Sequence, residues 1–367
     1  MPATEHYSII IIGAGLSGLF TAWNLQHKEC DAIILEARNR TGGRILSPHV
    51  NGNIDGCIDM GPAWVWPEFQ PRLQQLLSKL GIETFKQNTN GDMLYEMDAN
   101  TIERYSDQSS HEMSFRIVGG VNKIIKALQT ELPENSVHLN TQVTSIEKNN
   151  STSGSPLRIH TQRGGKSIDY TTDKIVLALP PRLTQSTINF SPELPIDIFK
   201  LWESTPTWMA GHCKIAFIYD KPFWREQKLS GEVFSRLGPL TEIYDGSTIE
   251  DSTFALTSFV GLSAHQRKQL GPEQLIKMCQ AQLLRLFGEE SKTVKDIQIK
   301  DWSLEQHTTT AVDLSTTPHH PQYPANMPRT LWDNQIILAG TEVAREHGGY
   351  IEGALESAEE ALTLLNS

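Results

Sequence analysis

The chain has 367 residues, of which 38% are hydrophobic and 20% are charged. This composition is that of a globular protein, and the length allows two structural domains, each with its own core. The net charge of −11 argues against nucleic acid or an anionic membrane as a partner and mildly favours a cationic substrate. The cysteines, Cys30, Cys57, Cys213 and Cys279, form no CxxC pair, so we expect no zinc or other metal site and no redox dithiol.

The N-terminal residues run into the first predicted strand almost at once. No charged-then-apolar leader precedes that strand, and no apolar run approaches membrane-spanning length. We therefore expect a cytoplasmic protein, in a reducing compartment, that binds no membrane.

Residues 8–18 predict a strand, a tight turn and the start of a helix. Four consecutive isoleucines, residues 9–12, indicate a buried parallel strand. Gly13, Gly15 and Gly18 follow with the Gly-x-Gly-x-x-Gly spacing. In this motif the first glycine permits the turn, the second lets a pyrophosphate approach, and the third lets the helix pack closely. Phosphates bind there because unpaired backbone N–H groups and the helix dipole point at them.

An acidic residue and a glycine pair complete the predicted nucleotide site. Glu36 ends the next strand, where it can accept hydrogen bonds from an adenosine ribose, and an acid there argues against NADP. Gly42 and Gly43 let the backbone lie flat against a ligand, and Arg44 can neutralise a pyrophosphate. The alternatives are a tight corner that binds nothing and an Asn/Gly-rich turn with a solvated arginine.

Residues 36–44, Glu-Ala-Arg-Asn-Arg-Thr-Gly-Gly-Arg, resemble a segment of the flavin-containing amine oxidase family, which includes monoamine, polyamine and L-amino-acid oxidases. The C-terminal stretch is similar to the same family in Ala-Gly-Thr-Glu at 339–342 and Gly-Tyr-Ile-Glu-Gly-Ala at 349–354. The resemblance implies an FAD enzyme that oxidises the C–N bond of an amine or amino acid to an imine, with O2 reoxidation giving H2O2. No cysteine follows Glu305-Gln306, where covalent members bond to the flavin, so we expect non-covalent FAD.

The resemblance also implies an α/β fold with two domains. A Rossmann-like FAD-binding domain of the GR2 type, similar to p-hydroxybenzoate hydroxylase, takes residues 1–81, 119–193 and 321–367. A mixed α+β substrate domain, discontinuous in sequence, takes residues 82–118 and 194–320. Residues 149–156 are expected to form a hairpin or a flexible tip rather than a linker.

Family members place further residues against the cofactor. Here Gly61 and Trp64 would lie beside the flavin ring, although tryptophans covering a core edge are an alternative, and Val143 would touch the adenine through its backbone. Trp302 would flank the flavin or belong to the core, and the C-terminal helix start would stabilise negative charge on the reduced flavin. The expected cofactor contacts are Gly13, Gly15, Ser17, Gly18, Glu36, Ala37, Arg38, Gly43, Arg44, Gly61, Ala63, Trp64, Val143, Trp302, Gly340, Glu342, Gly349, Tyr350 and Ile351.

Two residues carry the expected catalysis. Lys214 aligns with a family lysine that holds a water at the flavin and is tied to oxygen reactivity. It interrupts an apolar strand, where burial would lower its pKa, but an exposed edge-strand lysine is the alternative. Tyr350 matches one wall of the family's aromatic cage for the amine, with simple packing on the sheet as the alternative.

The chain departs from the family in two places. The second cage aromatic would fall at Val312, so an ordinary two-walled cage is in doubt, and His347 could supply a surface or simply be a loop histidine. The helical insertion that roofs the family's substrate cavity is missing, because only residues 82–118 are available. No counterpart of the carboxylate-binding arginine can be assigned there, although Arg104 and Arg116 lie nearby in sequence. We therefore expect a site that is open to large substrates or closed by a partner, either a homodimer mate or a carrier-bound substrate.

Two other functions stay open. Phytoene-desaturase-like and protoporphyrinogen-oxidase-like flavoproteins share both glycine motifs and act on C–C bonds. A non-catalytic flavin-binding partner protein would explain the missing roof and cage residue. An NAD dehydrogenase fits poorly, because Gly42-Gly43-Arg44 and the C-terminal helix start would have no role.

Overall fold

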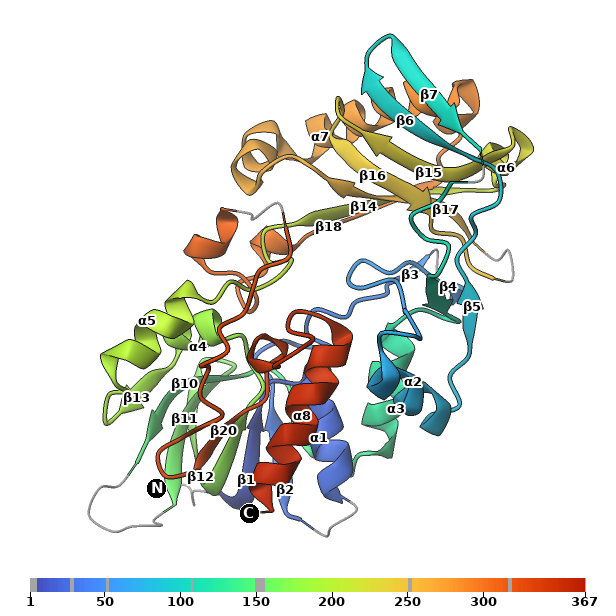
Figure 1. Ribbon diagram of the computed structural model, residues 1–367. Coiled ribbons are helices and arrows are strands. Elements are labelled where there is room, and N and C mark those ends of the chain that lie inside the picture. The colour runs from blue at the N-terminus through green and yellow to red at the C-terminus, as the bar shows by residue number, and fades with distance from the viewer. Residues whose placement is uncertain are drawn as a thin grey trace.

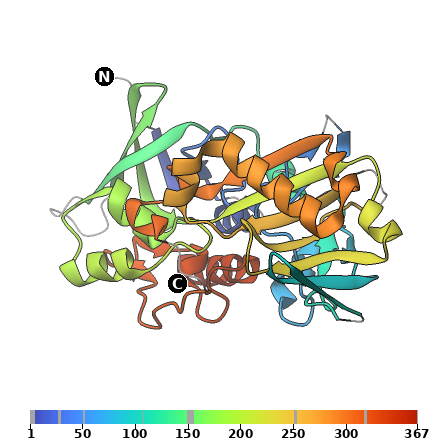
Figure 2. The same cartoon turned by 90° about the horizontal axis from the view of Figure 1, so that it is seen from above.

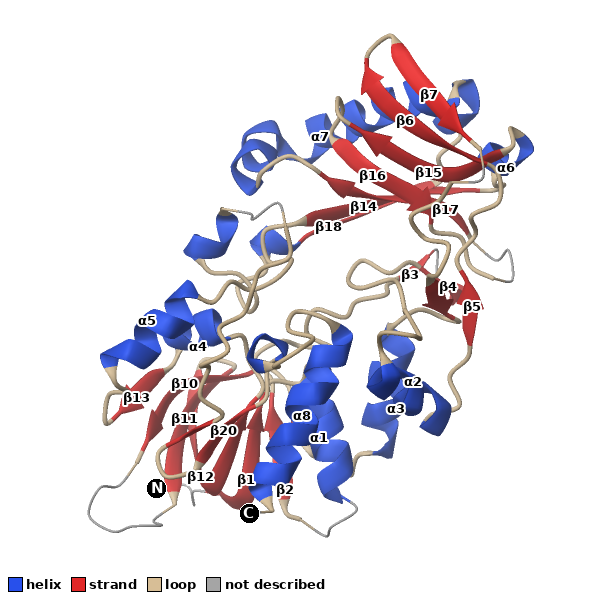
Figure 3. Cartoon of the chain, in the orientation of Figure 1, coloured by secondary structure: helices blue, strands red, loops and turns tan. Residues whose placement is uncertain are grey.

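The computed structural model describes residues 5–26, 30–50, 53–106, 108–148, 156–249, 253–315 and 319–366, without the side chains of 53–56. Within these ranges the chain forms two units, each built on a sheet, one in the lower part of Figure 1 and one in the upper part. Figure 3 shows their strands in red as two separate groups. Both ends of the chain lie at the first sheet (Figure 1).

The first sheet mixes parallel and antiparallel strands. Its strands are β1 (Glu5–Ile12), β2 (Ala32–Leu35), β9 (Val137–His138), β10 (Thr141–Glu147), β11 (Leu157–Arg163), β12 (Lys166–Leu177), β13 (Asn189–Ser191), β19 (Thr330–Leu331) and β20 (Ile336–Leu338). They run in the order β13-β10-β11-β12-β1-β2-β9, with β20 also beside β12. β1 is parallel to β2 and to β12, and β12 is parallel to β20. β10 and β11 are antiparallel, while the predicted tip between them lies outside the described residues except for Pro156.

The isoleucine run forms a buried strand that is parallel to both of its neighbours in this sheet, as predicted. Ile9 and Ile11 face a core shared with α1 (Leu16–Gln26), α3 (Asn122–Glu131) and α8 (Ile351–Leu365). Ile10 and Ile12 face a second core on the opposite side of the sheet. All four are buried because both faces of a parallel sheet are covered. In Figure 1, α1 and α8 lie side by side over β1 and β2.

The second core includes residues that the sequence assigned to the other domain. Trp202, on α5 (Ile196–Ser204), is completely buried against the first sheet together with Phe190 and Leu194. α5 also packs on α4 (Pro181–Thr187). Most apolar side chains of α5 thus pack on the first unit, although Ile196 is exposed, and the boundary expected at 193/194 stays a prediction.

The second sheet is almost entirely antiparallel. Its strands are β6 (Asp92–Asp98), β7 (Thr101–Tyr105), β14 (Cys213–Tyr219), β15 (Leu229–Ser235), β16 (Leu240–Asp245), β17 (Phe254–Val260) and β18 (Asp296–Asp301). They run in the order β18-β14-β17-β16-β15-β6-β7, and only β15 and β6 are parallel. α7 (Ala264–Phe287), interrupted at Gly271 and Pro272, covers one face, as the orange helix in Figure 2 shows.

The alternation of side chains along β14 decides what each face of this sheet contacts. Cys213, Ile215 and Phe217 pack with α7 in one core. Ala216 and Ile218 point the other way and pack with Ile58 and Met60 of the first unit's loops. Lys214 has the same phase as Ala216, so it is directed toward the first unit.

The described residues between 82 and 118, where no helical insertion is expected, contain four strands. β6 and β7 extend the edge of the second sheet, and β5 (Thr84–Lys86) pairs with β8 (Phe115–Ile117). None of the described residues between 82 and 118 lies in a helix. Elsewhere in the described ranges, no helix is both long enough and apolar enough to cross a membrane.

Candidate functional site

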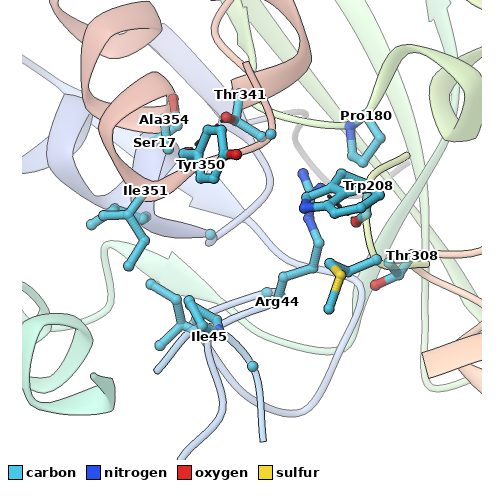
Figure 4. A pocket seen from close by; sticks show the side chains of 18 of the residues that line it. Ser17, Arg44, Ile45, Pro180, Trp208, Thr308, Thr341, Tyr350, Ile351 and Ala354 are labelled. Carbon is cyan, nitrogen blue, oxygen red and sulfur yellow. Dashed lines mark hydrogen bonds between the residues drawn. The ribbon is translucent and has the colours of Figure 1, made fainter. Parts of the chain in front are cut away.

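A cavity of about 340 Å³ lies between the two units, at the ends of β1, β2 and β12. Most of the predicted site residues line it: Gly13, Gly15, Ser17, Glu36, Arg38, Gly43, Arg44, Gly61, Ala63, Trp64, Lys214, Trp302, Gly340, Gly349, Tyr350 and Ile351. Ala37 and Val143 line a smaller cavity of about 40 Å³ that adjoins it. Gly18 and Glu342 line neither cavity. Figure 4 shows part of the larger cavity, with segments far apart in the chain converging on it.

The three glycines of the first motif differ in what surrounds them. Gly13 has a φ of +104°, and a Cβ there would lie 2.7 Å from the carbonyl oxygen of Ala178. At Gly18 a Cβ would lie 2.0 Å from the carbonyl oxygen of Gly13, so its lack of a side chain serves helix packing. At Gly15 a Cβ would meet no atom within 4 Å, because this position faces the cavity. The loop therefore offers open backbone to a ligand at Gly15, which is the fit that a dinucleotide phosphate requires.

Glu36 is fixed where the two cavities meet. Its buried carboxylate accepts hydrogen bonds from the backbone N–H groups of Ala14 and Arg38, each at 2.8 Å. It lines both cavities. The backbone N–H of Gly42 donates to the carbonyl of Ala14 at 2.8 Å, so the Gly42–Gly43 pair packs directly on the Gly-x-Gly-x-x-Gly motif.

Arg44 is held by Glu342 and is not the solvated arginine of the alternative interpretation. Its Nη1 and Nη2 lie 2.6 and 3.0 Å from the two carboxylate oxygens of Glu342, and Nη1 donates to the carbonyl of Trp208 at 3.3 Å. Burial lowers the pKa of Arg44, but the attraction of Glu342 outweighs it and leaves that pKa raised. Glu342 was expected among the cofactor contacts; it lies behind Arg44, outside both cavities, because its carboxylate is taken up by the guanidinium.

Replacing Glu342 by alanine is expected to destabilise the fold, because it leaves the Arg44 cation without its partner. We expect the free energy of unfolding to fall by about 3–5 kcal/mol, measured by urea denaturation. The double variant Arg44→Met with Glu342→Leu should recover part of that loss, because no unpaired charge remains. Equal stability of E342A and the unaltered protein would show that the pair contributes nothing to the fold.

Lys214 is 1% exposed, and its strand lies between β17 and β18, which excludes the edge-strand alternative. Its Nζ donates to the carbonyls of Asp59 and Gly61, both at 2.9 Å, and lies 5.1 Å from the ring centre of Phe259. Burial lowers the pKa of Lys214 to about 8, while the nearby carboxylate of Asp59 raises it. The cavity wall therefore carries a desolvated amine whose pKa lies well below the usual value for lysine.

A buried ion pair lies close to this lysine. Asp59 accepts hydrogen bonds from the Ser47 hydroxyl at 2.5 Å and from the Val121 N–H at 2.9 Å. Burial raises the pKa of Asp59, and Arg116, with its Nη2 3.9 Å from the Asp59 carboxylate, opposes that rise. Arg116 lines neither cavity, and Arg104 is half-exposed in a pair with Asp92. Neither arginine is placed to take the carboxylate of an amino acid in the cavity.

Trp64 lies both on the cavity wall and within an aromatic cluster, and its place beside the flavin ring stays a prediction. It lines the cavity, and it packs against His111 at 4.2 Å and against Tyr244 at 4.5 Å between ring centres. His111 lies between β7 and β8. Trp302 likewise lines the cavity while being 3% exposed, and its Nε1 donates to the carbonyl of Met60 at 2.9 Å.

Tyr350 belongs to an aromatic wall that the sequence does not predict. Its ring stacks on His320 at 4.5 Å and 8°, and His320 also contacts Trp208 at 5.0 Å. Trp208 lines the cavity, whereas Val312 is 51% exposed and outside it. His347 does not supply the missing surface, because its Nδ1 lies 3.3 Å from the Glu356 carboxylate and it is outside both cavities. No sequence signal marks His320 or Trp208, since their positions depend on contacts between distant segments.

The helix α8 begins at the cavity. Tyr350 is its N-cap and gives no side-chain hydrogen bond to the free N–H groups of the first turn. Ile351 and Ala354 from this turn line the cavity, so the positive end of the helix dipole is available to a ligand. Among the described residues, no three His, Cys, Asp or Glu side chains converge in a way that could hold a metal ion.

The sequence matches the model of the family described as flavin-containing amine oxidoreductase over residues 16–105 and 86–361. It is 24% identical to the probable flavin-containing monoamine oxidase A of Dictyostelium discoideum, over 96% of this chain and 95% of that protein. It is also 24% identical to the L-amino acid dehydrogenase of Synechocystis sp., over 98% of this chain and 95% of that protein. The first of these alignments extends over 457 positions against 367 residues here, so that relative carries segments that this chain lacks.

Solved structures share the fold. Putrescine oxidase, in its wild-type form bound to putrescine, superposes with a TM-score of 0.80 at 20% identity and covers 100% of both chains. Cyclohexylamine oxidase from Brevibacterium oxydans IH-35A gives a TM-score of 0.77 at 19% identity, over 97% of this chain and 98% of that one. The expected mixed α/β architecture is confirmed at this level.

Proposed function

The chain belongs to the family of flavin-containing amine oxidoreductases, and from that premise we propose that it oxidises the C–N bond of an amine to an imine. FAD, when bound, accepts the two electrons of this oxidation, and O2 reoxidises the reduced FAD with release of H2O2. One observation carries the proposal: the Gly-x-Gly-x-x-Gly loop, Glu36, Lys214 and the start of α8 all meet at a single cavity.

The first unit would hold the nucleotide, as in a GR2-type Rossmann-like domain. The open backbone at Gly15 and the charge of Arg44 suit the pyrophosphate, and the carboxylate of Glu36 suits the hydroxyls of the adenosine ribose. Ala37 and Val143, in the adjoining cavity, would contact the adenine. The described cysteines, Cys30, Cys57, Cys213 and Cys279, line neither cavity, which supports non-covalent binding.

Both units would contribute residues at the reacting end: Lys214 comes from the second sheet, and Tyr350 with the start of α8 comes from the first unit. Lys214 places a positive charge in a water-poor wall, where it would stabilise negative charge that develops on oxygen. Tyr350 and Trp208 would shield the amine from water and offer their ring faces to it. The start of α8 would stabilise negative charge with its uncapped N–H groups.

The charges on the cavity wall favour an amine without a carboxylate. Among the lining residues, the cations are Arg38, Arg44 and Lys214. Arg44 is bound to Glu342, Arg38 is bound to Glu36 and Glu305, and the Lys214 Nζ donates to two backbone carbonyls, so each of these cations already has partners. The largely aromatic and aliphatic lining, with Trp64, Trp66, Phe259 and Tyr350, suits an apolar amine. Closure of the site by a homodimer mate or a carrier-bound substrate, and a cytoplasmic location, stay predictions.

An anaerobic titration of the purified protein tests the function. We expect a yellow protein whose flavin absorbance is bleached by apolar monoamines. L-Amino acids with the same side chains should act at least about tenfold more slowly, because their carboxylate finds no partner. Bound flavin that no amine reduces would favour a C–C oxidising or non-catalytic flavoprotein, and equal reduction by amino acids would overturn the substrate class.

A further inference from the structure

The two cavities meet at a junction that is lined by residues of both units. The two cavities share Gly13, Glu36, Arg38 and Leu179 on the first unit, and they also share His307. His307 follows Trp302 and thus belongs to the segment that leaves the second sheet after β18. Any ligand that occupies both cavities must pass between these two sides.

The segment with His307 is tied to the first unit through Arg38. The Arg38 Nη2 donates to the Thr308 hydroxyl at 2.5 Å, and its Nε donates to the Glu305 carboxylate at 3.3 Å. On its other side, Nη1 of Arg38 lies 3.7 Å from Glu36. Arg38 therefore contacts both Glu36, which is expected to bind the ribose, and a segment 267 residues further along the chain.

This segment is itself a closed turn. The N–H groups of Thr308 and Thr309 both donate to the carbonyl of Glu305 at 2.8 Å. The Thr309 hydroxyl lies within hydrogen-bonding distance of the carbonyls of Trp302, at 2.7 Å, and Ala210, at 2.9 Å. Burial raises the pKa of Glu305, but Lys300 and Arg38 outweigh it and leave that pKa lowered, so the carboxylate is charged when it meets Arg38.

We propose that residues 305–308 form a strap that closes over the nucleotide where its adenosine part meets its phosphates, and that the Arg38–Thr308 bond keeps the strap shut. The inference rests on the proposed function, since it assigns new residues to the same cofactor. It also supplies a physical reason for retention of FAD without a covalent bond: release requires the strap to leave Arg38. Because the strap comes from the second unit, a bound nucleotide would also tie the two units together.

The rate of FAD release tests the strap independently of turnover. The FAD-loaded protein is diluted to nanomolar concentration, and the rise of free-flavin fluorescence gives the release rate. T308V removes the hydroxyl at nearly constant volume, and we expect release to be about tenfold faster, the effect of losing one charge-assisted hydrogen bond. H307A should also accelerate release, because it opens the junction of the two cavities.

T310V is the matched control. Its hydroxyl donates to Asp313 at 2.8 Å rather than to Arg38, so its release rate should stay within about twofold of the unaltered protein. Circular dichroism of the apoproteins shows whether each variant is folded. If T308V or H307A is not folded, E305Q serves as a further variant, because it weakens the contact between the strap and Arg38. If T308V and H307A hold FAD and are reduced by amines but release it at the unaltered rate, the strap is wrong and the amine oxidase assignment stands. A chain that takes up no FAD would overturn both.

Discussion

Replacing Gly15 by valine is expected to weaken FAD binding about 100-fold while leaving the apoprotein folded. A Cβ at this position meets no protein atom within 4 Å, and the backbone needs no positive φ, so the side chain enters only the cavity. There it would displace the pyrophosphate from the backbone N–H groups. The loss of two charge-assisted hydrogen bonds, about 3 kcal/mol, corresponds to roughly 100-fold weaker binding, measured by flavin fluorescence titration.

Gly18 provides the contrasting variant. G18A puts a Cβ 2.0 Å from the carbonyl oxygen of Gly13, so the melting temperature of the apoprotein itself should fall. G15V should keep the melting temperature of the apoprotein and lose only the increase that FAD produces. Tight FAD binding by G15V would mean that the cofactor phosphates do not use this loop.

Replacing Lys214 by methionine is expected to slow reoxidation by O2 about 100-fold, with reduction by the amine changed far less. Electron transfer to oxygen builds negative charge, and the buried ammonium of Lys214 is the cation on the cavity wall that no carboxylate neutralises directly. Stopped-flow kinetics of the two half-reactions separate the effects. K268M, at an exposed position on α7, is the control and should change neither.

The same lysine predicts a pH dependence. Because the pKa of Lys214 is lowered to about 8, its positive charge is lost as the pH rises through that value. The rate of reoxidation should therefore fall between about pH 7 and about pH 9 in the unaltered protein and stay flat in K214M. An equal loss in both half-reactions, or the same pH profile in both proteins, would remove the assigned role.

The amino-acid sequence by itself determined the local parts of the site. The four isoleucines predict a buried strand, and the glycine spacing after them predicts the turn, because burial on both faces and backbone freedom are properties of neighbouring residues. Glu36 follows from its place at the end of the next strand. The apolar residues around Lys214 indicate a buried position, and the structure adds that both faces of β14 are covered.

The tertiary structure alone decided which distant residues meet. The Arg44–Glu342 pair joins residues 298 apart, and the Arg38–Thr308 bond joins residues 270 apart. The stack of His320 on Tyr350 and the place of Trp208 in the wall depend on loops that carry no periodic pattern. The same holds for α5, whose apolar face is covered by the unit that its place in the chain does not suggest. A residue's own type limits what it can bind, but the path of the whole chain decides which partner comes within hydrogen-bonding distance.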